Sequence, residues 1–78
     1  MFHELDNVVL THNIDEYILK CGDVGTIVFC YKDNTAFEVE FVTADGRTIA
    51  LLTLDKDDIR TMGDREVLHV RELVETII

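Results

Sequence analysis

The fold of this chain is decided by a polar turn that opens into a long apolar run, KCGDVGTIVFCY at residues 20–31. The run is rich in β-branched and aromatic residues, so it predicts a loop that feeds a long strand. Gly22 lets the chain turn sharply, and Gly25 near the strand start indicates a bulge or a close backbone approach. Because Asp23 lies in this turn and no helix follows it, the turn is a poor phosphate site.

The rest of the chain predicts four further strands. Residues 37–41, FEVEF, alternate with period two, so the two phenylalanines and the valine should face the core while Glu38 and Glu40 face water. The other strands are expected at residues 7–11, 48–54 and 59–61, with turns at 32–35, at Asp45-Gly46 and at 55–58. The last of these turns is expected to be one turn of 3₁₀ helix.

Five short antiparallel strands with tight turns predict a small closed barrel of the SH3-like type, which we assign to residues 1–62. Residues 63–78 form a second segment, an amphipathic tail predicted to be helical and packed on the barrel or on a partner chain. Its apolar residues recur at helical spacing, with Val70, Val74 and Ile77 on one face, and Asp64 can cap its start. A strand over residues 67–71 is the alternative, because apolar and polar residues also alternate there.

The same segments resemble a known family. The stretch GDVGTIV at 22–28, Tyr31, AFEVEFV at 36–42, Asp45-Gly46 and ALLTL at 50–54 are similar to a small bacterial family catalogued as domain of unknown function 4926. The resemblance covers residues 5–61 and implies an SH3-like β-barrel in a bacterium. It brings no known catalytic or ligand-binding residues with it, so no residue role is transferred to this chain.

Composition narrows the classes of partner. The 78 residues carry 16 acidic against 7 basic side chains, a net charge of −9. The basic residues are scattered singly along the sequence, so nucleic acid and anionic membranes are disfavoured. There is no basic segment followed by an apolar one at the start of the chain, and no apolar run is long enough to span a membrane, so we expect a cytoplasmic protein.

Residues that would carry chemistry are sparse, and we expect no cofactor, no metal and no enzyme activity. The chain has no serine, which excludes a serine nucleophile, and Cys21 and Cys30 are expected to be free thiols. His3, His12 and His69 lack ligand spacing for a metal. The acidic loop of Asp55, Asp57 and Asp58 lacks the glycine and the closing glutamate of a calcium loop.

These observations favour a small protein-interaction module. We expect it to bind a protein partner, such as a basic toxin or an enzyme subunit, or to associate with itself through the tail. The alternative is a nucleic-acid-binding barrel similar to KOW domains, which the charge argues against. The candidate partner-binding residues are two tyrosines, two glutamates that should face water and three apolar residues of the tail: Tyr17, Tyr31, Glu38, Glu40, Val70, Val74 and Ile77. Tyr17 and Tyr31, with Phe29, are the residues expected to form an aromatic groove.

Overall fold

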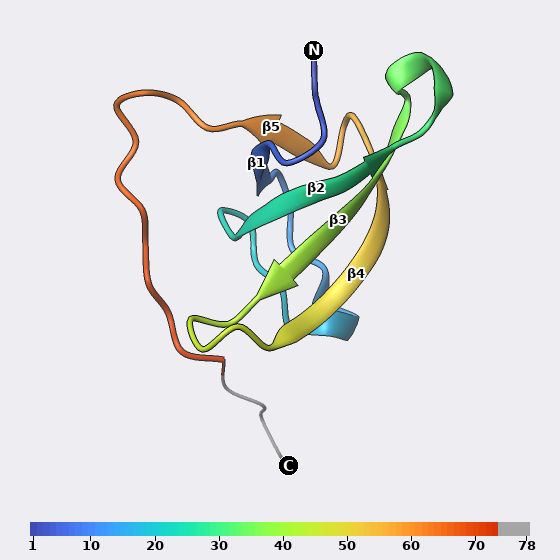
Figure 1. Ribbon diagram of the computed structural model, residues 1–78. Helices are drawn as coiled ribbons and strands as arrows, with labels where there is room; N and C mark the ends of the chain where they lie inside the picture. The colour runs from blue at the N-terminus through green and yellow to red at the C-terminus, as the bar shows by residue number, and fades with distance from the viewer. Residues whose placement is uncertain (74–78) are drawn as a thin grey trace.

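The structure, a computed structural model that describes residues 1–73, is one antiparallel five-stranded sheet with the strand order β4-β3-β2-β1-β5 (Figure 1). The strands are β1 (Asn7–Leu10), β2 (Val24–Cys30), β3 (Ala36–Val42), β4 (Thr48–Asp55) and β5 (Ile59–Thr61). Two short 3₁₀ helices, η1 (Asp15–Tyr17) and η2 (Lys32–Asn34), lie in the connections. The mainly-β class and all five predicted strands are therefore confirmed.

The predicted closure of the sheet into a barrel is wrong. β5 pairs with β1, β4 pairs with β3, and no pairing joins β4 to β5 within residues 1–73. The turn after β4 carries the chain across to β1, and the three residues of β5 pair there. Among the residues that the structure describes, the sheet consequently keeps two unpaired edges, a long one at β4 and a short one at β5.

The core lies on one face of the curved sheet. Alternation on β3 buries Phe37, Val39 and Phe41, as predicted, while Glu38 and Glu40 point the other way. The remaining core residues come from the other four strands and the β1–β2 loop: Val8, Leu10, Leu19, Ile27, Ala50, Leu54 and Ile59. Phe2 closes one end of the core by packing edge-on against Phe37, with ring centroids 5.1 Å apart.

Gly25 marks a close approach between β2 and β3. It pairs with Val8 on β1, and a Cβ built on it would lie 2.6 Å from Val39 Cγ1 and 2.8 Å from Phe41 Cε1. The predicted close approach is confirmed. The bulge of this strand lies further along, at Val28, where two β2 residues oppose one residue of β3.

Two of the predicted turns form as expected and the third differs in type. Gly46 in the β3–β4 turn adopts φ +86°, which an Asp-Gly hairpin requires, and Asp33 and Asn34 turn the β2–β3 connection with positive φ. Residues 56–58 make a tight turn but no 3₁₀ helix. The 3₁₀ turns occur instead at η1 and η2, in the β1–β2 and β2–β3 connections.

The tail prediction is wrong for the described residues. Residues 62–73, here called the strap, contain neither helix nor strand and run from β5 down one side of the sheet toward the β3–β4 turn (Figure 1). Val67 and Val70 are more than nine-tenths exposed, so the expected apolar helix face has no surface to pack on. Val74 and Ile77 lie outside the described residues. No helix within residues 1–73 is long and apolar enough to cross a membrane.

Candidate functional site

The outer face of the sheet gathers apolar and acidic side chains in two cross-strand rows. Phe29 on β2 lies across from Glu38, which lies across from Thr53 on β4. Glu40 lies across from Leu51 in the next row. With Tyr31, which follows β2, these residues make the outer patch: Phe29, Tyr31, Glu38, Glu40, Leu51 and Thr53. About half of the surface of Phe29 (48%) and Leu51 (56%) is exposed.

Hydrogen bonds fix both carboxylates of the outer patch. The Tyr31 hydroxyl donates to Glu38 Oε2 at 2.9 Å, and the Thr53 hydroxyl donates to the same oxygen. Thr48 donates its hydroxyl to Glu40 Oε2 at 2.7 Å. The hydrogen bond to Glu38 raises the pKa of Tyr31, so this phenol stays protonated and keeps donating. Each carboxylate retains further lone pairs for an incoming donor.

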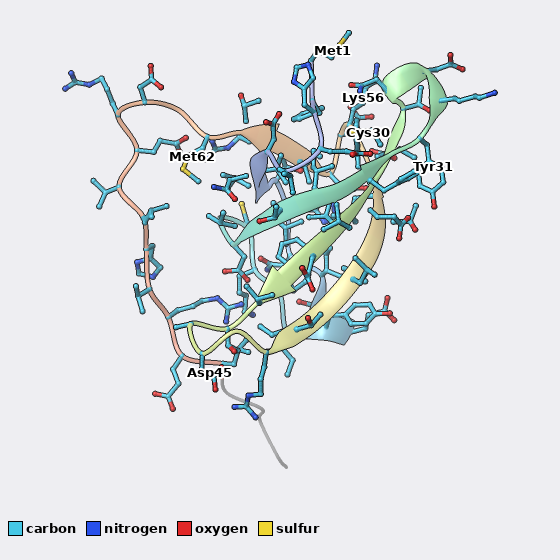
Figure 2. All side chains as sticks on the ribbon, in the orientation of Figure 1. Met1, Cys30, Tyr31, Asp45, Lys56 and Met62 are labelled. Carbon is cyan, nitrogen blue, oxygen red and sulfur yellow. The ribbon has the colours of Figure 1, made fainter. Side chains whose placement is uncertain are left out.

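The aromatic pair of the patch is also ordered. Phe29 and Tyr31 pack edge to face, with ring centroids 5.0 Å apart and planes at 82°. Tyr31 lies at the end of the sheet where β2 turns into β3 (Figure 2). Tyr17 belongs to η1, which Figure 1 places at the opposite end, so the predicted groove of Tyr17 with Tyr31 and Phe29 does not form. Leu51 and Thr53 were not predicted, because β4 is apolar at successive positions and its outward face could not be identified.

A second feature is an apolar cleft of about 480 Å³ between the sheet and the strap. Val24, Phe41 and Ile49 of the sheet and Leu19 of the β1–β2 loop line one side of the cleft, and residues that include Leu68 and Val70 line the strap side. The candidate residue Val70 therefore borders this cleft and not the outer patch. Nothing in the described residues brings the two groups of predicted binding residues together.

Two ion pairs hold the strap, and one of them, between Arg71 and Asp23, lines this cleft. Arg60 forms a bidentate ion pair with Glu66, in which both nitrogen–oxygen distances are 2.7 Å. Arg71 binds Asp23 in the same manner, with Nε 2.8 Å from Oδ1, and also donates to the Ile18 carbonyl at 2.8 Å. Arg71 and Asp23 are 48 residues apart in the chain, so no local sequence pattern signals their contact.

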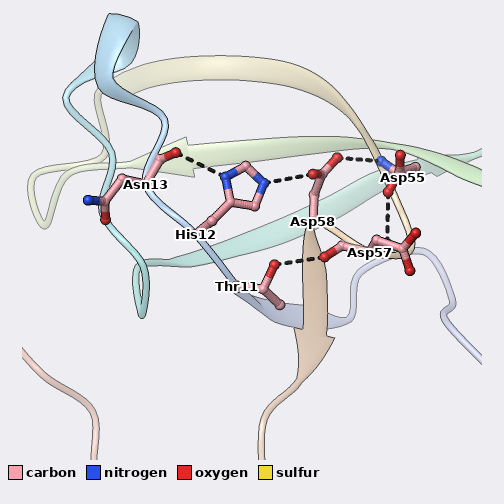
Figure 3. Close-up of polar contacts among 6 residues, drawn as sticks. All are labelled: Thr11, His12, Asn13, Asp55, Asp57 and Asp58. Carbon is pink, nitrogen blue, oxygen red and sulfur yellow. Dashed lines mark hydrogen bonds and ion pairs between the residues drawn. The ribbon is translucent and has the colours of Figure 1, made fainter.

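A polar cluster ties the β1–β2 loop to the β4–β5 turn (Figure 3). His12 Nε2 lies 2.7 Å from Asp58 Oδ1, and its Nδ1 lies 2.9 Å from the Asn13 carbonyl. Thr11 donates its hydroxyl to the Asp57 carbonyl at 2.7 Å. The hydrogen bond to Asp58 raises the pKa of His12, with the Asn13 carbonyl acting in the same direction. The cluster therefore fastens the β1–β2 loop to the β4–β5 turn.

We expect the hydrogen bond between His12 and Asp58 to make the stability of the domain depend on pH near neutrality. The pKa of His12 in the folded state lies above its usual value of 6.5. The contribution of the contact to the free energy of unfolding is therefore complete below pH 6.5, and it is lost as the pH rises through the folded-state pKa. Histidine titration followed by NMR should place His12 above 6.5, and Asp58→Asn should bring its pKa down. A His12 pKa that is unchanged in Asp58→Asn would contradict the pairing.

The other groups considered for chemistry stay apart. No group of three or more His, Cys, Asp or Glu side chains within residues 1–73 is arranged to hold a metal ion. Cys21 and Cys30 are free thiols, as expected. Burial raises the pKa of the Cys30 thiol, and acidic neighbours add to the shift, which disfavours a reactive thiolate.

The fold and the surfaces define a class: a small acidic β-domain with an open five-stranded sheet, an ordered aromatic–acidic outer face and an ion-paired strap. Residues 4–61, which span β1 to β5, match the family described as Domain of unknown function (DUF4926), and the chain belongs to that family. The match ends before the strap. No curated protein and no solved structure matches the chain.

Proposed function

We propose that this domain is a protein-interaction module, without catalytic activity, that binds a basic segment of a partner protein across the outer patch. The observation that supports it is the juxtaposition of the Phe29–Tyr31 pair with two hydrogen-bonded carboxylates on one exposed face. A guanidinium group stacks on aromatic rings and pairs with carboxylates, so an arginine-bearing segment suits this surface.

The overall charge supports the same partner. A net charge of −9 on 78 residues attracts basic proteins over long range and accelerates their encounter. Three of the seven basic side chains, Arg47, Arg60 and Arg71, are already paired with acidic neighbours. A basic toxin or a basic enzyme subunit in the cytoplasm is the kind of partner we propose. Binding of nucleic acid is the alternative, and the pairing of these arginines weakens it further.

The test is an NMR titration with a short peptide that alternates arginine and leucine, in low salt. We expect amide shifts at Phe29, Tyr31, Glu38 and Glu40, and affinity that falls as salt is added. Glu38→Gln with Glu40→Gln should weaken binding about tenfold, or about 1.4 kcal/mol. A peptide that alternates glutamate and leucine should cause no shifts.

The matched control is Asp15→Asn with Glu16→Gln, which removes the same charge from the first turn of η1. If the control weakens the arginine peptide as much as the patch variant, the attraction is only general charge and the proposed site is wrong. A gel shift with RNA or DNA at low salt, if it appears while the peptide does not bind, would favour the nucleic-acid alternative.

A further inference from the structure

The β4 edge is the largest unpaired backbone surface of the described chain. β4 has eight residues, more than any other strand, and it borders the sheet (Figure 1). Within residues 1–73, the backbone groups of residues 49–54 form hydrogen bonds with β3 alone. Alternate N–H and C=O groups of an edge strand point outward, so this edge presents a row of free donors and acceptors.

The two edges of the sheet are protected very differently. β5 is three residues long and carries Arg60, and short, charged edges resist further pairing. From Thr48 to Leu54, β4 carries no charge and no proline, and Thr48, Ile49 and Thr53 are β-branched residues that favour strands. A bulge at Ile49 interrupts its start, because Phe41 pairs with Ala50 while Val42 pairs with Thr48. Residues 50–55 remain regular and open to pairing.

We infer that β4 pairs with β4 of a second copy of this chain, antiparallel and about a two-fold axis perpendicular to the sheet. This axis keeps the outer faces of the two copies on the same side of the joined sheet. Leu51, which is 56% exposed, therefore lies beside Leu51 of the second copy. The two sheets then form one continuous sheet, and the exposed leucines cover each other on its outer face.

The charges at the ends of β4 indicate a second copy as the occupant. Asp45 and Arg47 precede the strand, and Asp55 and Lys56 close it, so Figure 2 shows Asp45 and Lys56 at opposite ends. Leu51 is equidistant in sequence from Arg47 and Asp55. Antiparallel pairing centred on Leu51, with the bulge at Ile49 adding one residue on that side, therefore brings the Arg47 end of β4 to the Asp55 end of the second copy. By symmetry, a basic Arg47 and an acidic Asp55 then lie near each other at both ends of the pair.

This inference depends on the strand edge and its charges, and it stands whether or not the outer patch binds a basic segment. It has a consequence for that patch, because Glu40 lies across from Leu51. In the dimer, the two outer patches adjoin across the axis and present four patch carboxylates on one face. A basic partner with repeated arginines then meets two adjacent sites, which raises its avidity without new contacts.

The test measures mass by light scattering between about 10 µM and about 1 mM, because association follows mass action. We expect the mass to rise from one chain toward two. Leu51→Lys should stay monomeric over this range, because it places two like charges opposite each other. Val67→Lys makes the same charge change on the exposed strap and should dimerise like the unmodified chain.

Amide hydrogen exchange of the unmodified chain gives a readout that needs no variant. Protection of the outward amides of residues 50–54 should increase with protein concentration, while the amides of β5 should not change. A mass of one chain at every concentration would overturn the inference. So would a dimer that survives Leu51→Lys, or one that Val67→Lys abolishes, because the interface would then lie at another surface or at the strap.

Discussion

Replacing Gly25 by alanine should destabilise the domain by about 1–3 kcal/mol, the cost of forcing one carbon into a packed core. The added Cβ would lie 2.6 Å from Val39 Cγ1 and 2.8 Å from Phe41 Cε1. Val39 and Phe41 are almost completely buried, so neither side chain can move aside without disturbing its own neighbours. Thermal unfolding should show the loss as a lower Tm, by about 4–8 °C for each kcal/mol in a domain of this size.

A second substitution separates this steric cause from a general effect of losing a glycine. Phe41→Leu removes the ring atoms nearest to the new carbon, so Gly25→Ala should cost less in the Phe41→Leu background than alone. Gly46→Ala is the comparison, because Gly46 has open space around its Cα and only its positive φ opposes alanine. Phe41→Leu should leave the cost of Gly46→Ala unchanged. Equal rescue of both glycine variants would refute the close-packing account.

The strands could be predicted because each has a local signal. Period-two alternation fixed which side chains of β3 face the core, and it also placed Glu38 and Glu40 on the opposite face. The Asp-Gly pair at 45–46 located the β3–β4 turn. Closure could not be predicted in this way. It depends on whether a three-residue β5 pairs with β4 as well as with β1, and strand count carries no such information.

The strap shows the opposite case, where a strong local pattern misled. Apolar residues recur at helical spacing from Val67 onward, but a helix needs a surface that covers its apolar face, and Val67 and Val70 have none. Valine is also a poor helix former, so local propensity does not compensate. Contacts between distant residues decide the path instead, as when Arg71 reaches Asp23. The predicted groove of Tyr17 and Tyr31 failed for the same reason, because the sequence does not show where a loop residue such as Tyr17 lies relative to the sheet.

Asp23→Ala should be the most damaging change at the surface of the domain, by about 1.5–3 kcal/mol, the range for hydrogen bonds to charged groups. Asp23 accepts from the Arg71 guanidinium and from the Lys20 amide at 2.8 Å, and its side chain is only 18% exposed. Removing it leaves the guanidinium and the amide without their partner and frees the strap. Trypsin should then cleave after Arg65 faster than in the unmodified chain.

The pH dependence of the same pair provides a second measurement. Burial alone would raise the pKa of Asp23, but the hydrogen bonds from Arg71 and Lys20 outweigh it and lower the pKa below 3.8. Because folding lowers the pKa of Asp23, its stabilising contribution is complete above the pKa that it has in the unfolded chain. This contribution is lost as the pH falls through its folded-state pKa. The difference in unfolding free energy between the unmodified chain and Asp23→Ala should therefore be largest above about pH 4 and should shrink in acid.

Arg47→Met is the matched control for the strap, since Arg47 pairs with Asp45 in an exposed position with 82% and 63% of the two side chains accessible. Such pairs contribute little, so at about 10 µM, where we expect a single chain, Arg47→Met should change stability by less than about 0.5 kcal/mol. Arg71→Met should cost clearly more, yet less than Asp23→Ala, because Asp23 keeps the Lys20 amide and regains water. Equal effects of Arg71→Met and Arg47→Met would mean that the strap is not held by its ion pair. The cleft beneath it would then owe its shape to the sheet alone.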